Sequence, residues 1–397
     1  MSKKQLSATK LRIIGHIQGK QKGPTVVFFG GIHGNEPCGV DALEQTFQKL
    51  KMSSASIRGT IYGIHGNIPA QLQRKRFLDT DLNRLWTSAG IKAIKTKKET
   101  DLSHEEHELI EIHALVLNII ALHTPPFYFV DIHSTSGRTM PFITINDALI
   151  NRRFSKHFPV PIVLGIEEYL EGPLLSYINS LGYVSLGFEA GQHTEEASVK
   201  NSMAFIGLAL VFAGCLQRNE AANFDRYYQN LQQAASGNTS FYEVVHRYLI
   251  PIGGRFRMAL GFENFEEVRK GTVMAMQEER KVRAKKDAIV FMPLYQEQGQ
   301  EGFFLIRKIP LWALQWSALL RRLKLHRLLT LLPGISWADT QKESLLVNLK
   351  IARFFTKSFF HLLGYRNKTL DKDHLLMYNR EHTAKNDMYK NTGRFSK

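Results

Sequence analysis

The first 220 residues alternate short apolar runs with polar segments of helical period, which is the pattern of a β–α arrangement. The apolar runs predict strands over residues 25–29, 60–64, 127–132 and 184–188, and helices are expected to begin near Glu36 and Ser103. Three of these strands lead directly into a histidine or a glutamate. We therefore expect an α/β fold with a mostly parallel or mixed sheet and ionisable side chains at one of its edges.

Ligands of open α/β sheets bind beyond the carboxyl ends of the strands, where loops from several strands converge. His33 and Glu36 follow the first predicted strand, His133 ends the third, and Glu189 ends the fourth. One sheet edge can therefore bring all four side chains together.

The segment Gly-Gly-Ile-His-Gly-Asn-Glu-Pro at residues 30–37 places His33 and Glu36 three residues apart in a loop of small residues. Zinc accepts imidazole nitrogen and carboxylate oxygen, and a catalytic site with two histidines and one glutamate leaves a fourth position for water. His133 is the natural third ligand. A second copy of the loop has Ile68 where the first has Glu36, so His65 is not expected to bind metal.

Several motifs together resemble the succinylglutamate desuccinylase and aspartoacylase family, which is related to the zinc carboxypeptidases. The motifs are His-Gly-Asn-Glu at 33–36, Arg-Phe at 76–77 followed by Asp-Leu-Asn-Arg at 81–84, Asp-Ile-His-Ser-Thr at 131–135, and Glu189. They occur in the family's order and at its approximate spacing. The resemblance covers residues 24–195 well and 235–308 more loosely.

The resemblance implies a carboxypeptidase-like mixed sheet flanked by helices, followed by a small β-rich domain that narrows access to the site. It also implies one zinc ion per chain, held by His33, Glu36 and His133. Further roles implied by the resemblance are carbonyl polarisation by Arg76, binding of a substrate carboxylate by Asn83 and Arg84, proton transfer by Glu189, and closure of the site by Tyr295.

Other interpretations of these residues stay open at the level of sequence. Asn83 and Arg84 can equally cap and flank the start of a helix, and Glu189 can pair with a surface lysine. Asp131 either orients a metal-binding histidine or simply ends a strand. The best-known members of the family bind a second substrate carboxylate with an arginine shortly before the catalytic glutamate, and residues 177–182 contain none. The substrate is therefore expected to be another N-acyl amino acid or a small ester.

The C-terminal third of the chain has a different character. Residues 235–309 are rich in glycine and in β-type alternation, and they predict a small second domain after a catalytic domain at 1–225. From residue 310 to 397 the pattern predicts a basic helical extension. Its helical stripe consists of Leu345, Leu349, Ala352, Phe355, Phe359 and Leu363, with Lys350, Arg353 and Lys357 away from part of it.

The net charge of +16 is concentrated in that extension, where 16 Lys and Arg stand against 6 Asp and Glu. Such a segment can pack on the enzyme or a second subunit, lie on an anionic membrane, or touch nucleic acid. Packing of the extension on the enzyme or on a second subunit is the preferred interpretation. Trp312 and Trp316 make contact with a membrane the second alternative. No known nucleic-acid-binding motif accompanies the charge, which disfavours nucleic acid.

The two cysteines and the polar N-terminus predict a cytoplasmic protein without a disulfide framework or signal peptide. The expected function is zinc-dependent hydrolysis of an amide, or an ester, in a small carboxylate-bearing N-acyl amino acid. The alternatives are a carboxypeptidase acting on short peptides, and an inactive hydrolase fold that serves as an adaptor through its basic tail.

Overall fold

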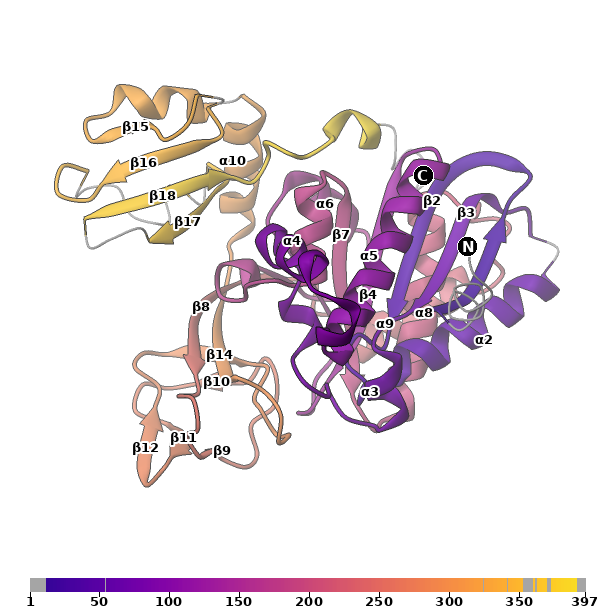
Figure 1. Ribbon diagram of the computed structural model, residues 1–397, viewed down its shortest axis with the longest axis horizontal. Coiled ribbons are helices and arrows are strands. Elements are labelled where there is room, and N and C mark those ends of the chain that lie inside the picture. The colour runs from indigo at the N-terminus through magenta and orange to yellow at the C-terminus, as the bar shows by residue number, and fades with distance from the viewer. Residues whose placement is uncertain are drawn as a thin grey trace.

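A computed structural model describes residues 12–53, 55–323, 325–340, 342–352, 360, 363–369 and 373–390. Its main feature is an 11-stranded mixed sheet in the order β1-β3-β2-β4-β7-β5-β6-β8-β14-β13-β10 (Figure 1). The four predicted strands are consecutive neighbours in this order, next to the β1 edge, and run parallel to one another. They are β2 (Gln21–Gly30), β3 (Arg58–His65), β4 (Phe127–Thr135) and β7 (Val184–Gln192).

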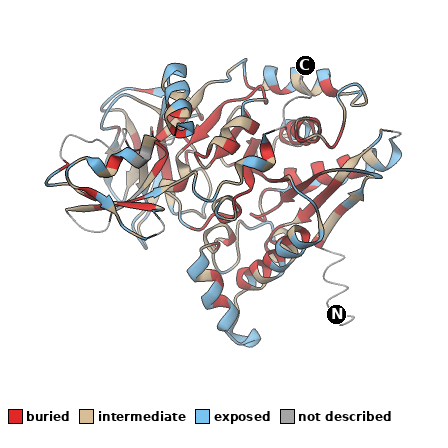
Figure 2. Ribbon diagram, turned by 90° about the horizontal axis from the view of Figure 1, so that it is seen from above, coloured by how far each residue is buried: buried red, intermediate tan, exposed pale blue. Residues whose placement is uncertain are grey.

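These four strands are apolar on both faces because helices cover both sides of this part of the sheet. Val26 and Phe28 of β2 pack into one core cluster with α2 and α8, whereas Val27 and Phe29 pack into a second cluster with α5. Figure 2 shows the buried residues concentrated in these strands and in the helix surfaces that face them. The helices of this part are α2 (Cys38–Met52), α3 (Ile68–Leu72), α4 (Ser88–Thr96), α5 (His104–Leu122), α6 (Leu149–Ser155), α7 (Leu174–Ser180), α8 (Glu196–Ala213) and α9 (Phe224–Ala234).

Helix α8 is the one helix within the described residues that is long and apolar enough to cross a membrane. Of this helix, 67% is buried inside the protein, where it packs against α2, α9 and β7. Burial in the protein core therefore explains the apolar composition of α8.

The remaining strands of the large sheet lie on the far side of β7. They are β5 (Phe142–Ile145), β6 (Ile162–Leu164), β8 (Phe241–Leu249), β14 (Glu301–Lys308), β13 (Ala288–Phe291) and β10 (Glu267–Val268), while β1 (Ile13–Gln18) forms the opposite edge. A separate three-stranded sheet contains β9 (Phe256–Met258), β11 (Val273–Gln277) and β12 (Arg280–Arg283). The mixed sheet and the β-rich region that follows it confirm the predicted fold class. However, β8 and β14 continue the main sheet because β8 pairs with β6.

The prediction of a helical C-terminal extension is correct for α10 (Leu311–Arg322) and wrong for the described segments that follow the short η4 (Leu325–Leu331). These segments form a four-stranded antiparallel sheet of β15 (Ile335–Trp337), β16 (Ser344–Asn348), β18 (His374–Asn379) and β17 (Tyr365–Thr369). Leu345 and Val347 are fully buried on one face of β16. The buried apolar residues therefore recur every second residue, as in a strand, where the sequence predicted a helical period. Phe355, Phe359, Arg353 and Lys357 lie outside the described residues.

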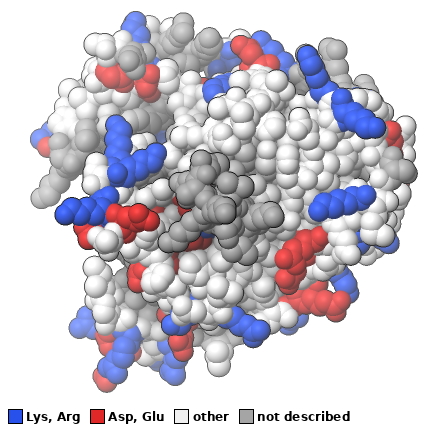
Figure 3. Space-filling view, turned by 45° about the vertical axis from the view of Figure 1, so that its right-hand side comes forward, with Lys and Arg blue, Asp and Glu red and all other residues white. Residues whose placement is uncertain are grey.

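The chain then returns to the large sheet, as the yellow segment in Figure 1 shows. Tyr389, in the short η5 (Asn386–Tyr389), is buried in the core cluster that contains α2 and α8. Its hydroxyl donates a hydrogen bond to the carbonyl of Phe127 and accepts one from the amide of Val184 at 3.1 Å. The last described turn of the chain is therefore part of the main core. On the face in Figure 3, Lys and Arg are scattered among Asp and Glu.

Candidate metal centre

The loop after β2 is shaped by close backbone contacts. Gly31 has a φ of +73°, which favours glycine, and the amide of Gly34 donates to the carbonyl of Arg76 at 3.1 Å. A Cβ atom at Gly34 would lie 2.2 Å from the carbonyl carbon of Ala70. The loop can therefore pass under α3 only with glycine at this position, and this path turns His33 and Glu36 toward β4.

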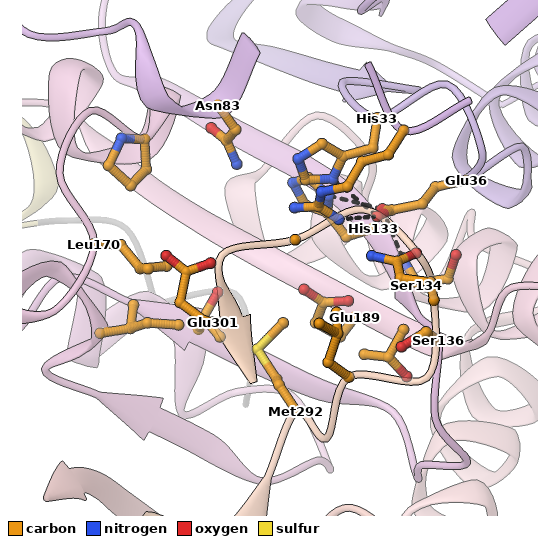
Figure 4. Close-up of a pocket in the computed structure, with 18 of the residues that line it drawn as sticks. His33, Glu36, Asn83, His133, Ser134, Ser136, Leu170, Glu189, Met292 and Glu301 are labelled. Atoms are coloured by element: carbon orange, nitrogen blue, oxygen red, sulfur yellow. Dashed lines mark hydrogen bonds and ion pairs between the residues drawn. The ribbon is translucent and has the colours of Figure 1, made fainter. Parts of the chain in front are cut away.

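His33, Glu36 and His133 form one buried cluster (Figure 4). Nδ1 of His33 lies 2.8 Å from one carboxylate oxygen of Glu36, and Nδ1 of His133 lies 2.9 Å from the other. The ligand atoms of the three residues all lie within 4.8 Å of one another. The three side chains predicted as zinc ligands are thus brought together with their donor atoms facing a single point.

The outward nitrogens of both imidazoles face carboxylates. Nε2 of His133 lies 2.7 Å from Asp131, and Nε2 of His33 lies 3.1 Å from Asp81. A carboxylate that accepts the outer N–H of a histidine leaves the inner nitrogen as a lone-pair donor, which is the usual arrangement around metal ligands. The donor set and these partners fit a zinc ion. Of the two interpretations of Asp131, the geometry favours orientation of His133.

The ionisable residues of the cluster shift one another's pKa values strongly. Burial would raise the pKa of Glu36, but the imidazoles of His33 and His133 hold it well below its usual range. Burial would lower the pKa of His133, but Asp131 and Glu36 raise it well above its usual range. Glu36 therefore stays an anion and an attractive ligand for a cation.

Glu189 lies on β7 directly beside His133 on β4. It is buried, and its Oε2 atom has no hydrogen-bond partner among the described residues. Burial raises the pKa of Glu189 to about 8, with His133 opposing the shift and Glu36 adding to it. A carboxyl group with a pKa near neutrality and a free oxygen can both accept and return a proton.

The predicted arginines and Asn83 line the same pocket as the metal cluster. The Arg76 guanidinium lies 3.4 Å from Glu36 and 3.1 Å from Asp81. The side-chain oxygen of Asn83 accepts a hydrogen bond from the amide of Leu174 at 2.8 Å, which orients its NH2 group. Arg84 is paired with Glu301 of β14 at 3.1 Å.

The structure does not bring Tyr295 into this pocket. Its hydroxyl donates to the carbonyl of Ala259 at 2.8 Å and accepts from the amide of Phe262 at 3.0 Å, so it is engaged within the β-rich region. His65 lies outside the three-residue cluster found among the described residues.

Sequence reasoning missed the contributions of Asp81 and Glu301. Asp81 stands within the quoted Asp-Leu-Asn-Arg motif, and its position two residues before Asn83 was the available signal. Glu301 has no such signal, because it reaches the pocket only through the pairing of β14 with β8.

The segment that carries the cluster and Glu189 is similar to a known domain family. Residues 22–204 match the model of the succinylglutamate desuccinylase/aspartoacylase catalytic domain. A succinylglutamate desuccinylase from Photorhabdus laumondii is 33% identical over 76 residues, which are 19% of this chain and 22% of that protein. The match thus spans about a fifth of this curated relative.

Two solved structures share the fold. A succinylglutamate desuccinylase/aspartoacylase from Rhodobacter sphaeroides has a TM-score of 0.55 at 17% identity, over 74% of this chain and 88% of that one. A succinylglutamate desuccinylase from Vibrio parahaemolyticus has a TM-score of 0.51 at 15% identity, over 73% and 83% respectively. Each alignment leaves about a quarter of this chain uncovered.

Proposed function

Residues 22–204 belong to the succinylglutamate desuccinylase/aspartoacylase catalytic domain family, and we propose from this premise that the protein is a zinc-dependent hydrolase. Its reaction is removal of an acyl group from a small carboxylate-bearing N-acyl amino acid, in the cytoplasm. The observation that carries the proposal is the buried cluster of His33, Glu36 and His133 with Glu189 beside it, whose Oε2 atom has no hydrogen-bond partner among the described residues.

His33, Glu36 and His133 would hold the zinc ion, which when bound supplies a Lewis acid and activates water at neutral pH. Imidazole with carboxylate at an open site favours zinc over harder cations. Asp131 and Asp81 keep the two imidazoles in the orientation in which Nδ1 faces Glu36.

Glu189 is the proton carrier of the proposed reaction. Its free Oε2 atom accepts a proton from the attacking water and returns it to the leaving amine. Arg76 is held beside Glu36 by Asp81, where its guanidinium can face the negative charge that develops on the carbonyl oxygen. Loss of one such donor typically costs about 2.7 to 4 kcal/mol in the barrier.

Two other functions are compatible with the same residues. The site can serve a carboxypeptidase that acts on short peptides, because cleavage of a peptide bond uses the same water and the same proton carrier. Product analysis on peptides and N-acyl amino acids separates the two. An inactive adaptor is disfavoured because the metal-site geometry and Glu189 are all present.

The proposal is tested by elemental analysis of the wild type and His33→Ala, together with hydrolysis of a panel of N-acyl amino acids. We expect about one zinc per wild-type chain, with both metal and activity lost in the variant. A wild type that binds no metal after reconstitution and hydrolyses nothing would overturn the proposal in favour of the adaptor.

For the C-terminal region we propose contact with an anionic membrane surface through α10. Leu311, Trp312 and Trp316 are exposed on this helix at 68%, 64% and 55%. The exposed Lys308 ends β14 just before the helix, and the exposed Arg322 is its last residue. Exposed tryptophan beside basic residues suits an anionic interface.

Sedimentation with phosphatidylserine vesicles tests this contact. The full-length protein should sediment with the vesicles, and a Trp312→Ala, Trp316→Ala double variant should not. Leu260→Ala, whose leucine is also exposed, should sediment like the wild type. Equal retention of all three proteins would contradict the contact.

A further inference from the structure

The pocket contains an ion pair between two residues that both line it. Nη2 of Arg84, in the short η1 (Leu82–Arg84), lies 3.1 Å from Oε2 of Glu301 at the start of β14. The two side chains are 21% and 12% exposed, so the pair is largely shielded from water. In Figure 4 Glu301 lies on the same side of the pocket as Asn83 and Leu170, with Glu189 between it and Ser136.

The charges of the described pocket-lining residues disfavour a substrate with two or more carboxylates. Arg76 and Arg84 are the only lysines or arginines among them, whereas the acids are Glu36, Glu189 and Glu301. Arg76 is already paired with Asp81 and Glu36, and Arg84 is paired with Glu301. No unpaired guanidinium or ammonium is therefore present in this described lining to receive a second carboxylate.

A single substrate carboxylate meets a further obstacle at Arg84. If it displaced Glu301 from the guanidinium, the Glu301 carboxylate would be left shielded and without a partner, which is unfavourable. A substrate that also brings a cation removes this obstacle, because the cation takes the place of Arg84 beside Glu301. The arrangement suits a ligand that carries one negative and one positive group.

On the basis of the proposed hydrolase function, we propose that the substrate is a monoacylated diamino acid. Its carboxylate binds Arg84 and the amide NH2 of Asn83, and its free ammonium binds Glu301. Leu170 and Ile166, which line the same pocket, offer apolar contact to the methylene groups between the charges.

The reaction consumes one water molecule. The amide C–N bond breaks, a bond forms between the carbonyl carbon and the water oxygen, and the water proton taken up by Glu189 passes to the departing nitrogen. The products are a carboxylic acid and a free diamino acid.

The test compares N-acyl amino acids that differ in charge. Nα-acetyl-L-ornithine and Nδ-acetyl-L-ornithine carry the extra ammonium, Nα-acetyl-L-norvaline lacks it, and N-acetyl-L-aspartate carries an extra carboxylate. We expect kcat/KM of the better ornithine derivative to exceed that of the norvaline derivative by about 10- to 100-fold, the range of one charged hydrogen bond. Glu301→Gln should remove this preference, mainly through KM, while Glu278→Gln in an exposed strand connection should keep it.

Binding of two simple carboxylates by calorimetry to the zinc-loaded protein gives a readout that is independent of turnover. 5-Aminopentanoate carries one carboxylate and one ammonium, whereas pentanoate carries the carboxylate alone. Tighter binding of 5-aminopentanoate than of pentanoate, lost in Glu301→Gln, supports the inference even if no panel member is hydrolysed, a result that would overturn only the proposed function. Two outcomes would overturn the inference. One is preference for N-acetyl-L-aspartate. The other is equal use of all substrates, with Glu301→Gln accelerating the anionic ones, because Glu301 would then only neutralise Arg84.

Discussion

Both ring nitrogens of His133 lie within hydrogen-bond distance of a carboxylate, since Nδ1 faces Glu36 and Nε2 faces Asp131. The same holds for His33, whose two nitrogens face Glu36 and Asp81. Because the outer carboxylates set the direction of the inner lone pairs, the quality of the proposed metal site depends on residues that do not touch the metal. We therefore expect Asp131 and Asp81 to affect zinc affinity although neither is a predicted ligand.

Asp131→Asn tests this dependence at one atom. An amide can no longer accept the Nε2 proton of His133 in the same charged hydrogen bond, so we expect zinc affinity to fall by about 10- to 100-fold. Competition with a fluorescent zinc chelator measures the affinity. Asp79→Asn, at an exposed aspartate that contacts His104, serves as the control. An affinity equal to that of the wild type would show that Asp131 is only a strand residue.

Glu189→Gln separates proton transfer from metal binding. The amide has nearly the same size but cannot take a proton, so we expect the rate to fall by about 100- to 10,000-fold with zinc content unchanged. Activity on the best N-acyl substrate and elemental analysis of the same sample provide the two measurements. Loss of zinc together with activity would instead make Glu189 part of the metal site.

At the scale of elements, the site is made by the loop after β2 and the ends of β4 and β7. The parallel pairing of these three strands places Gly30 opposite Ile132 and His133 opposite Glu189. The carboxyl ends of the strands therefore coincide, and the glycines of the loop let it turn back toward that edge. Loop shape and strand register together decide the positions of the predicted ligands.

Gly34→Ala probes the loop. The new Cβ would lie 2.2 Å from the backbone of Ala70, so the loop or α3 must shift and the His33–Glu36 geometry is disturbed. We expect zinc content and activity to drop severalfold or more, with a lowered melting temperature. Gly237→Asn is the matched control, since its φ of +69° is tolerated by asparagine and nothing lies within 4 Å of the new Cβ. A variant that retains full zinc content would show that the loop has room to adapt.

At the scale of the whole molecule, the C-terminal sheet is joined to the main fold by a buried ionic network. Asp147 contacts Arg321 of α10 at 2.7 Å and Arg380 at 2.9 Å, and it also contacts Arg152 of α6. Arg380 pairs in addition with Glu168 of η3 (Ile166–Glu168). Since Ile166 lines the pocket, the network links the C-terminal region to a wall of the site.

Asp147→Asn is expected to destabilise the protein by about 3 to 5 kcal/mol at neutral pH, because it removes the one carboxylate that the buried guanidinium groups of Arg152, Arg321 and Arg380 share. Burial opposes ionisation of Asp147, but Arg152, Arg321 and Arg380 hold its pKa far below the usual range. Its contribution to stability is therefore complete above the unfolded pKa of about 4 and is lost as the pH falls through the lower folded pKa.

Urea unfolding of both proteins between pH 2 and 7 measures this effect. The difference in unfolding free energy between wild type and variant should shrink as the pH falls below about 4. Glu196→Gln, at an exposed pair with Lys200, should leave the unfolding curve nearly unchanged. A difference that is independent of pH would mean that the variant acts through packing alone.

Local sequence determined the four parallel strands, the loop that carries His33 and Glu36, and the residue types on which the proposed metal chemistry rests, because each of these depends on residues that are neighbours in the chain. The apolar runs that become β2, β4 and β7 end next to ionisable side chains, and parallel strands bring such ends to one edge. This is why His33, Glu36, His133 and Glu189 could be predicted together.

Only the tertiary structure decided the rest. Residues 344–348 have an apolar pattern compatible with either period, and pairing with β18 makes them a strand. Glu301 meets Arg84 across 217 residues because β14 pairs with β8 and β8 with β6. Contacts at such separations depend on how distant segments pack, and that information is not contained in any local pattern of residues.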